Sequence, residues 1–325
     1  MSTPQRVFML GASGSIGRAT AHELVRRGHE VTCLLRRALP DGTLPETARV
    51  RMGSVADPAT WAQGGLCGER FDAVVSCLAS RSGVAAEAWA IDHLAHRHAL
   101  AAAQGAGVRR FVLLSALCVQ KPRLAFQHAK RAFEADLAAS GLAASIVRPT
   151  AFFKSITGQV ERVSQGAPYL VFGDGRLTAC KPIADEDLAA YLANCLDDER
   201  PGTQILPIGG PGPALTPHDL AEHLFGELGR PLRIRRVPLA LLDGIAATLG
   251  TASRLMPFVP VLATKAELAR IGRYYASESM LVWDAAAGRY DADATPEFGQ
   301  RSVLDFQSAL VRGELRVERG EHAVF

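Results

Sequence analysis

The sequence predicts an α/β fold in which a doubly wound parallel sheet is followed by a smaller C-terminal lobe. Three observations predict it: short uninterrupted apolar runs, helical segments that alternate with them, and a glycine-rich turn after the first run. The chain has 325 residues, 48% of them hydrophobic, so it can form one large domain or a domain with a lobe. We expect the first domain over residues 1–150, and a capping region, partly continuous with the sheet, over residues 151–325.

In the first half, apolar runs rich in valine and leucine indicate buried parallel strands. Apolar residues recur at helical spacing between them, and Asp57-Pro58 is typical of a helix start. The expected strands are 6–10, 30–35, 50–52, 72–77, 110–114 and 144–147. The expected helices are 15–27, 85–105 and 126–140.

In the second half the pattern is looser, because glycine and proline gather at 173–175 and 207–217. Capped helices are expected over 185–196 and 216–229. The apolar segment 237–263 is interrupted by Asp243 and Arg254, and the chain has no uninterrupted apolar run of membrane-spanning length. Three interpretations of this segment stay open: a mobile apolar lid, a membrane-touching patch, or a buried structural helix.

The composition excludes several classes of protein. The net charge is 36 − 33 = +3 and aromatic residues are 6%, which argues against nucleic acid as a partner. Six scattered cysteines lack zinc spacing, so we expect free thiols in a reducing compartment and no metal site. We also expect no signal or transit peptide, because residues 1–6 lead directly into the first strand.

The turn after the first strand has the spacing G-x-x-G-x-x-G and opens the first helix. Gly11 permits a tight exit from the strand, Gly14 lets a pyrophosphate approach the backbone, and Gly17 lets the helix pack closely. The helix N-terminus offers free N–H groups to phosphate. This context predicts a Rossmann-type dinucleotide site. Its expected residues are Gly11, Ser13, Gly14, Ser15, Ile16, Gly17 and Arg18.

The cofactor is expected to be NADPH, which makes residues 1–150 an NADP-binding domain. An NAD site usually has an acidic residue about 20 positions after the glycines. Here Arg36 and Arg37 stand at that distance (36 − 17 = 19), and two guanidiniums suit a 2′-phosphate. Asp57 either reaches the adenine or caps the helix at Pro58. Further cofactor contacts are expected at the ends of later strands, from Ser76, Cys77, Leu78, Ala79, Arg148, Pro149 and Thr150.

Ser115 closes the fifth strand and Lys130 lies on the next helix, at the sheet edge where ligands bind in open α/β folds. Residues 5–150 resemble the short-chain dehydrogenase/reductase superfamily, whose pattern is Tyr-x-x-x-Lys with a preceding serine. Here the pattern is Phe126-Gln-His-Ala-Lys130. A ketone reductase needs a phenol to protonate the alkoxide, so the phenylalanine favours alkene reduction, or an inactive NADP(H)-sensing protein. Ser115 and Lys130 are the expected catalytic residues, and Lys130 is also expected to hold the nicotinamide ribose.

Residues 6–313 resemble more closely the NADPH-dependent divinyl chlorophyllide 8-vinyl reductases. The stretches that carry this resemblance are SCLASRSG (76–83), LSALCVQKP (114–122), IVRPTAFFKS (146–155), FGDG (172–175), CKPI (180–183), LPIGGPG (206–212) and IGRYYASESML (271–281). The resemblance implies reduction of the 8-vinyl group of divinyl chlorophyllide or protochlorophyllide to ethyl, with NADPH. Two alternatives stay open: a non-catalytic NADP(H)-sensing or assembly protein, and another NADPH-dependent alkene reductase.

The implied pigment is flat and apolar and carries a propionate, so its pocket should combine apolar walls with a cation. The expected substrate residues are Phe126, Phe152, Phe153 and Lys154, with Arg123 and Lys181 as further candidates for the propionate. The proton donor is unassigned among Lys130, Tyr274 and Tyr275. His93 and His96 are expected at the surface rather than as metal ligands. The chain resembles the bacterial members, which implies a cytoplasmic protein with peripheral contact at the inner membrane.

Overall fold

The computed structural model describes residues 3–63, 66, 68–256 and 258–315 and falls into two compact units. The first, here called the Rossmann unit, comprises Met1–Ser80, Ala85–Pro149 and Asp185–Pro207. The second, the C-terminal unit, comprises Arg81–Val84, Thr150–Ala184 and Ile208–Phe325. One boundary between the two units falls between Pro149 and Thr150, and the Rossmann unit also includes a helix and a strand from residues Asp185–Pro207.

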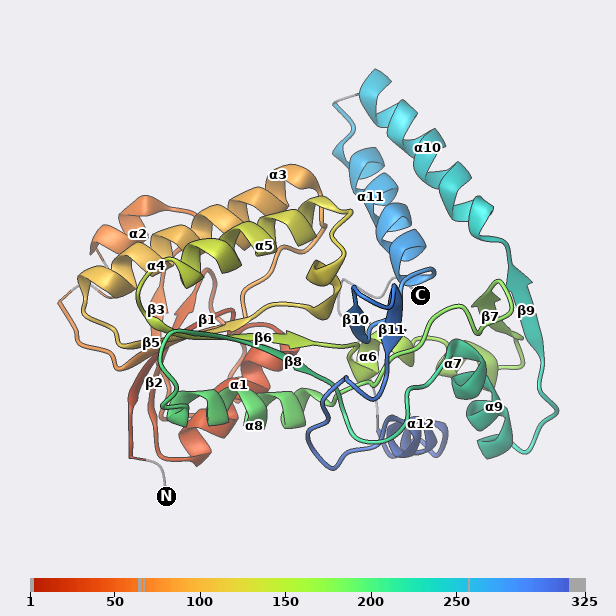
Figure 1. Cartoon of the computed structure of the whole chain (residues 1–325), viewed down its shortest axis with the longest axis horizontal. Coiled ribbons are helices and arrows are strands. Elements are labelled where there is room, and N and C mark those ends of the chain that lie inside the picture. The colour runs from red at the N-terminus through yellow and green to blue at the C-terminus, as the bar shows by residue number, and fades with distance from the viewer. Residues whose placement is uncertain (1–2, 64–65, 67, 257, 316–325) are drawn as a thin grey trace. The chain divides into compact units, whose positions relative to one another are not determined.

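A seven-stranded sheet forms the centre of the Rossmann unit, in the order β3-β2-β1-β4-β5-β6-β8 (Figure 1). The pairings from β3 through β6 are parallel, which confirms the predicted doubly wound sheet. The strand order reverses at β1, whose two neighbours are β2 and β4, and this switch point is where such sheets bind ligands. The strands are β1 Arg6–Leu10, β2 Glu30–Leu35, β3 Arg49–Met52, β4 Ala73–Ser76, β5 Arg110–Leu114, β6 Ala143–Pro149 and β8 Thr203–Ile208.

Helices cover both faces of this sheet (Figure 1). On one face lie α1 Ser15–Arg26 and α8 Asp185–Asn194, and the 3₁₀ turn η3 Cys195–Asp197 follows α8. On the other lie α2 Pro58–Gln63, α3 Ala85–Ala88, the π-helix η1 Trp89–Ala95, α4 His96–Gly105 and α5 Ala125–Ala138, with η2 Leu117–Gln120 before α5. Phe8 and Phe111 of the sheet pack with Phe133 of α5 in the core. The predicted helix over 85–105 is continuous, because α3, η1 and α4 follow one another without a break. It contains a wider π-helical section, which the apolar pattern does not indicate.

The C-terminal unit has its own apolar core, in which Phe153, Tyr169 and Phe225 are buried. The predicted helix at 216–229 is present as α9, and Thr216 caps it by accepting a hydrogen bond from the backbone N–H of Asp219. The helices are α6 Phe153–Ile156, α7 Val160–Ser164, α9 Pro217–Glu227, α10 Leu239–Leu255, α11 Pro260–Tyr275 and α12 Val303–Val311. The strands are the parallel pair β7 Tyr169–Phe172 and β9 Ile234–Val237, and the antiparallel pair β10 Val282–Asp284 and β11 Arg289–Asp291.

The segment 237–263 forms most of a helical hairpin made by α10 and α11 (Figure 1). Gly250 is the one buried residue of α10, so the interpretation of this segment as a buried structural helix is wrong. Among the described residues, none of the helices combines the length and apolar character needed to cross a bilayer.

Candidate functional site

The glycine loop after β1 is shaped by backbone contacts that exclude side chains. Gly11 has φ +77°, and a Cβ there would lie 2.5 Å from the backbone nitrogen of Leu78. A Cβ on Gly17 would lie 2.1 Å from the carbonyl oxygen of Gly11. Both positions therefore require glycine, one for a left-handed turn against the end of β4 and the other for close packing of α1 on the loop.

The space beside Gly14 is open, in contrast. A Cβ there would meet only the Gly11 carbonyl oxygen, at 3.7 Å, and the residue is exposed. Gly14 is also the N-cap of α1, and no cap side chain accepts a hydrogen bond from the first-turn N–H groups at this end. This geometry fits the pyrophosphate of a dinucleotide. Ser13 is exposed beside it, while Ser15, Ile16 and Arg18 are half-buried.

Arg36 and Arg37 directly follow β2, and both are exposed. This places two guanidiniums at the carboxyl end of the strand next to β1, where the adenosine ribose of a Rossmann-bound dinucleotide lies. Asp57 accepts a hydrogen bond from the backbone N–H of Ala59 at 2.9 Å. Its carboxylate thus caps α2, one of the two roles that the sequence leaves open.

The end of β4 contributes a buried polar contact. Ser76 Oγ lies 2.8 Å from Nε2 of His96, and both side chains are buried. Burial also raises the pKa of the Cys77 thiol to about 12, so this cysteine is neutral and not a nucleophile. Leu78 is half-buried and Ala79 is exposed.

Lys130 lies 3.1 Å from the carboxylate of Asp92, a residue that the sequence analysis did not single out. The side chain of Asp92 is fully buried, whereas that of Lys130 is 11% exposed. Asp92 also accepts hydrogen bonds from the backbone N–H and the hydroxyl of Ser80, at 3.1 and 2.5 Å. The expected catalytic lysine is thus held by a carboxylate that is itself fixed at the end of β4.

Ser115 belongs to a second polar cluster. Its hydroxyl donates a hydrogen bond to Glu134 at 2.5 Å, and Glu134 also accepts from Arg148 Nε at 3.1 Å. Glu134 stands one helical turn after Lys130 on α5, so the two clusters share a face of that helix. The structure therefore brings Ser115 and Arg148 together, but through a glutamate that sequence reasoning missed.

His96 is buried, so its expected surface position is wrong. Burial, followed by the nearby charge of Lys130, lowers the pKa of His96 from 6.5 to about 4. The unfolded chain then takes up a proton between pH 6.5 and 4 that the native protein does not. The contribution of neutral His96 to the free energy of unfolding is therefore complete above pH 6.5 and is lost as the pH falls toward 4. The difference corresponds to about 3 kcal/mol.

Thermal unfolding across this pH range tests this assignment. The His96→Gln variant should lose less stability than the parent protein between pH 6.5 and 4, because glutamine does not titrate. His128→Gln, which removes an exposed histidine of α5, should follow the parent protein. Equal pH dependence of His96→Gln and the parent would contradict the assigned role of His96.

The expected substrate residues occupy different environments. Phe126 is half-buried on α5, one turn before Lys130. In the C-terminal unit, Phe152 is half-buried and Lys154 is exposed. Phe153 differs from the expectation, because it is 4% exposed and packs against Phe306 in the core.

Most of the other residues that the sequence indicates as cofactor contacts, propionate contacts or proton donors are buried. Lys181 is buried and pairs with Glu297 at 2.5 Å, so its charge is already balanced. Thr150 is buried and donates its hydroxyl to the carbonyl of Lys181. Pro149 is buried at the end of β6 and Arg123 is exposed. Tyr274 is buried beside the exposed Tyr275.

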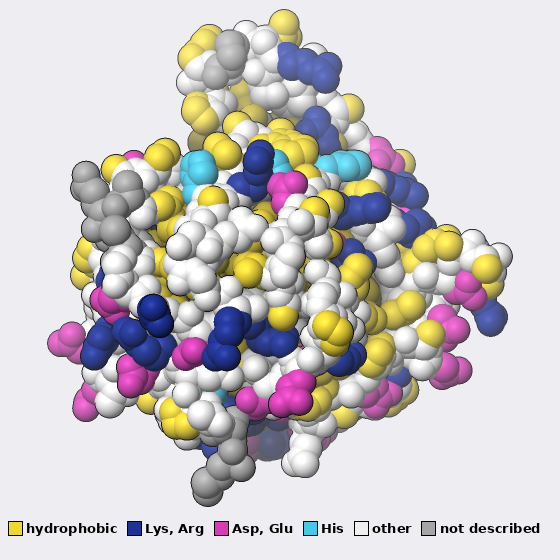
Figure 2. All heavy atoms as spheres, turned by 60° about the vertical axis from the view of Figure 1, so that its left-hand side comes forward, with side chains coloured by type: hydrophobic (Ala, Val, Ile, Leu, Met, Phe, Trp, Pro, Cys, Tyr) yellow, Lys and Arg dark blue, Asp and Glu magenta, His cyan; other side chains and the backbone are white. Residues whose placement is uncertain are grey.

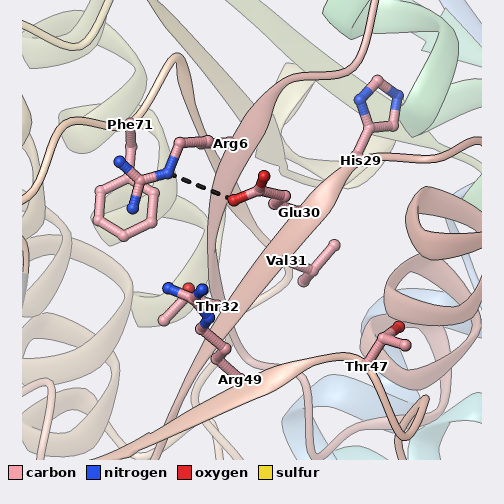
Figure 3. A pocket seen from close by; sticks show the side chains of 8 residues that line it. All are labelled: Arg6, His29, Glu30, Val31, Thr32, Thr47, Arg49 and Phe71. Atoms are coloured by element: carbon pink, nitrogen blue, oxygen red, sulfur yellow. Dashed lines mark ion pairs between the residues drawn. The ribbon is translucent and has the colours of Figure 1, made fainter.

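A separate small pocket lies at the amino ends of β1, β2 and β3 (Figure 3). Arg6 and Glu30 face one another across it at 3.5 Å. Its other lining residues are His29, Val31, Thr32, Thr47, Arg49 and Phe71. Because the glycine loop follows the carboxyl end of β1, this pocket is not the candidate cofactor site.

Comparisons with known proteins identify a nicotinamide-dinucleotide-binding domain. A family model described as NAD(P)H-binding matches residues 11–199. The NAD⁺ complex of the Bordetella bronchiseptica enzyme WbmH superposes with a TM-score of 0.58 at 22% identity, over 71% of this chain and 85% of that one, which shows a shared fold. The photosystem II assembly factor Ycf39 of Synechocystis is 24% identical over 73% of this chain and 72% of its own length.

A much stronger match is the chloroplastic divinyl chlorophyllide a 8-vinyl-reductase of Oryza sativa subsp. indica. It is 45% identical to this chain, and the match covers 98% of this chain and 82% of the rice protein. Identity of this extent spans both units, from the glycine loop to the C-terminal motifs. The chain therefore belongs to the divinyl chlorophyllide a 8-vinyl-reductase family and carries its NAD(P)H-binding domain.

Proposed function

We propose that this protein uses NADPH to reduce the 8-vinyl group of divinyl chlorophyllide, or of divinyl protochlorophyllide, to an ethyl group. The observation that carries the proposal is 45% identity to a divinyl chlorophyllide a 8-vinyl-reductase over 98% of the chain. The glycine loop and the paired arginines after β2 support NADPH as the reductant. Phe126 stands where a ketone reductase of this superfamily has a phenol, and its absence suits an alkene acceptor.

The residues of the chain then act mainly by binding and orientation. NADPH held there would supply the hydride, and the second hydrogen of the ethyl product would come as a proton from water or from another group of the protein. The uncapped N-terminus of α1 holds the pyrophosphate, and Arg36 with Arg37 holds the 2′-phosphate. Lys130 donates hydrogen bonds to the nicotinamide ribose. Orientation of this kind can supply several orders of magnitude of rate without a dedicated acid at position 126.

The substrate contacts are proposed for each unit by itself. Phe126 of the Rossmann unit and Phe152 of the C-terminal unit offer half-buried aromatic rings to an apolar macrocycle. Lys154 is an exposed cation suited to a propionate. Phe153 is left out, because it fills the core of its unit.

A direct assay tests the activity. Purified protein is incubated with NADPH and divinyl chlorophyllide, and the pigments are separated and identified by absorption and mass. We expect a product heavier by two hydrogens with a blue-shifted Soret band, in an amount equal to the NADPH consumed. Protein that binds NADPH but leaves the pigment unchanged, with protochlorophyllide as well, would contradict the proposal.

A non-catalytic assembly protein is the second candidate, and the similarity to Ycf39 favours it. That match is weaker in identity and covers 73% of the chain against 98% for the reductase. The same assay separates the two functions, because an assembly protein would bind NADPH without turnover.

A reducing compartment, such as the cytoplasm of a bacterium, is proposed as the location. No disulfide joins two of the described cysteines, which suits a compartment where glutathione or thioredoxin keeps thiols reduced. Cys67 lies outside the described residues. The chloroplast stroma, where the plant relatives by their names are found, would satisfy the same chemistry.

Peripheral membrane contact is proposed at the tip of the α10–α11 hairpin. Four apolar side chains are exposed there, and the largest exposures are 77% for Phe258 and 76% for Leu255. The other two are Met256 and Val261. Between Asp243 and Glu267 the sequence has two charged residues, Arg254 and Lys265, and both are cations. Figure 2 shows apolar atoms next to dark blue cationic side chains on this hairpin. An apolar tip with flanking cations suits a bilayer that contains anionic lipid.

Vesicle sedimentation tests this contact. Phe258→Glu should reduce binding to vesicles of phosphatidylcholine with phosphatidylglycerol by at least about 10-fold, because it removes an apolar contact of about 1.5–3 kcal/mol. The matched control Ile205→Glu, at a residue of β8 that is 53% exposed, should bind like the parent protein. No binding by the parent, or an equal loss in both variants, would contradict the assigned surface.

A further inference from the structure

We propose that Asp92 is the positioning residue that holds Lys130 for the cofactor. Lys130 is the expected contact to the nicotinamide ribose, and this inference rests on that part of the proposed function. The Asp92 carboxylate lies 3.1 Å from the Lys130 ammonium. The position of the Lys130 ammonium is thus fixed by an ion pair between η1 and α5, in addition to the backbone of α5.

The Asp92 carboxylate is fixed from a second side. Its Oδ1 accepts from the backbone N–H of Ser80 at 3.1 Å, and its Oδ2 accepts from the Ser80 hydroxyl at 2.5 Å. Ser80 follows the end of β4, the strand that pairs with β1. Asp92 therefore ties Lys130 to the edge of the sheet at the switch point.

Stability alone does not account for this arrangement. The Asp92 side chain has no exposed surface, and burying an ion pair commonly costs as much desolvation as it returns in attraction. A pair of apolar residues would pack these helices at least as well. The Lys130 side chain keeps 11% of its surface exposed, so its remaining N–H donors can reach a ligand. The pair is arranged to present a cation rather than to close a core.

The local backbone supports this interpretation. Asp92 lies in the π-helix η1, between α3 and α4. A π-helical section accommodates extra residues in a helix, changes which side chains face the neighbouring helix, and occurs frequently at functional sites. The same section also faces α5 at the surface, where His93 lies 3.0 Å from Asp136. These two pairs join the same elements, one buried and one partly exposed.

A double-mutant cycle on NADPH binding tests the proposal. Asp92→Asn keeps the shape of the side chain and removes its charge, and should weaken NADPH binding by about 10-fold. Lys130→Met should weaken it at least as much. In the Lys130→Met background, Asp92→Asn should change NADPH affinity by less than about 2-fold, because Asp92 acts through the lysine. Equal losses in both backgrounds would show an independent structural role and would overturn the proposal, as would unchanged affinity in Asp92→Asn.

Two further variants protect this test from a folding artefact. Asp136→Asn breaks the partly exposed pair of His93 and Asp136 between the same elements and should leave NADPH affinity unchanged. Ser80→Ala removes one hydrogen bond from Asp92 and keeps the ion pair, so NADPH affinity should fall about 3-fold. This variant carries the test if Asp92→Asn itself fails to fold. Loss of affinity in Asp136→Asn equal to that in Ser80→Ala would overturn the proposal. Because the readout needs no pigment, failure of vinyl reduction and failure of this inference remain distinguishable.

Discussion

Replacing Gly17 by alanine is expected to weaken NADPH binding severely and to lower the thermal stability of the protein. The new Cβ would lie 2.1 Å from the carbonyl oxygen of Gly11, a distance that real Cβ atoms do not adopt. Since Gly11 is itself held against the backbone of Leu78, the loop cannot move away without separating from β4. We expect NADPH affinity to fall more than about 100-fold, which corresponds to nearly 3 kcal/mol.

Gly14→Ala is the matched control, because the same atom is added one helical turn earlier where space is open. Its nearest neighbour would be 3.7 Å away, and its φ of −79° suits alanine. We expect its unfolding free energy to change by no more than about 1 kcal/mol, the usual cost of alanine at an N-cap. NADPH affinity should still fall about 10-fold, because the methyl group occupies the space assigned to the pyrophosphate.

Calorimetry and NADPH titration on the two variants distinguish an effect on the stability of the fold from an effect on NADPH binding. Gly17→Ala should lose both stability and affinity, whereas Gly14→Ala should lose affinity alone. Full NADPH affinity in Gly14→Ala would place the pyrophosphate elsewhere, and full affinity in Gly17→Ala would show that the loop tolerates a shift.

The elements of the Rossmann unit were predictable because their signals are local. Buried parallel strands such as β1 and β5 need continuous apolar runs, and the glycine loop needs glycine at Gly11 and Gly17 for steric reasons that the spacing alone indicates. The sequence predicts that the second half adds to the sheet but does not locate strand β8, whose residues are less buried and whose run contains a proline.

The polar clusters around Lys130 were not predictable, because each joins residues far apart in sequence. Asp92 and Glu134 lie on helices where acidic residues are usually solvated, so nothing local marks them as buried. Asp92 lies in the π-helical section η1, which has no apolar signature. The sequence predicts a surface position for His96 for the same reason, since a histidine in an alanine-rich helix gives no sign of its partner Ser76.

Replacing Arg36 and Arg37 together by alanine should reverse the preference for NADPH. Both guanidiniums are exposed after β2, where each can make a charge-assisted bond to the 2′-phosphate. Two such bonds together contribute about 3 kcal/mol or more, so NADPH affinity should fall at least about 100-fold. NADH lacks the phosphate, so its affinity should stay within about 2-fold of the parent value.

The control for this prediction removes the same charge from the opposite end of the sheet. Arg26 and Arg109 are exposed and pair with Glu23 and Asp72, far from the carboxyl ends of the strands. Arg26→Ala/Arg109→Ala should therefore leave the ratio of NADPH to NADH affinity unchanged, whereas a general effect of net charge would lower NADPH affinity in both double variants. Titrations at low and high salt add a second criterion, because only direct phosphate contacts keep a large NADPH preference once long-range attraction is screened. An equal loss of NADPH and NADH affinity in the Arg36/Arg37 variant would mean that these side chains support the loop rather than read the 2′-phosphate.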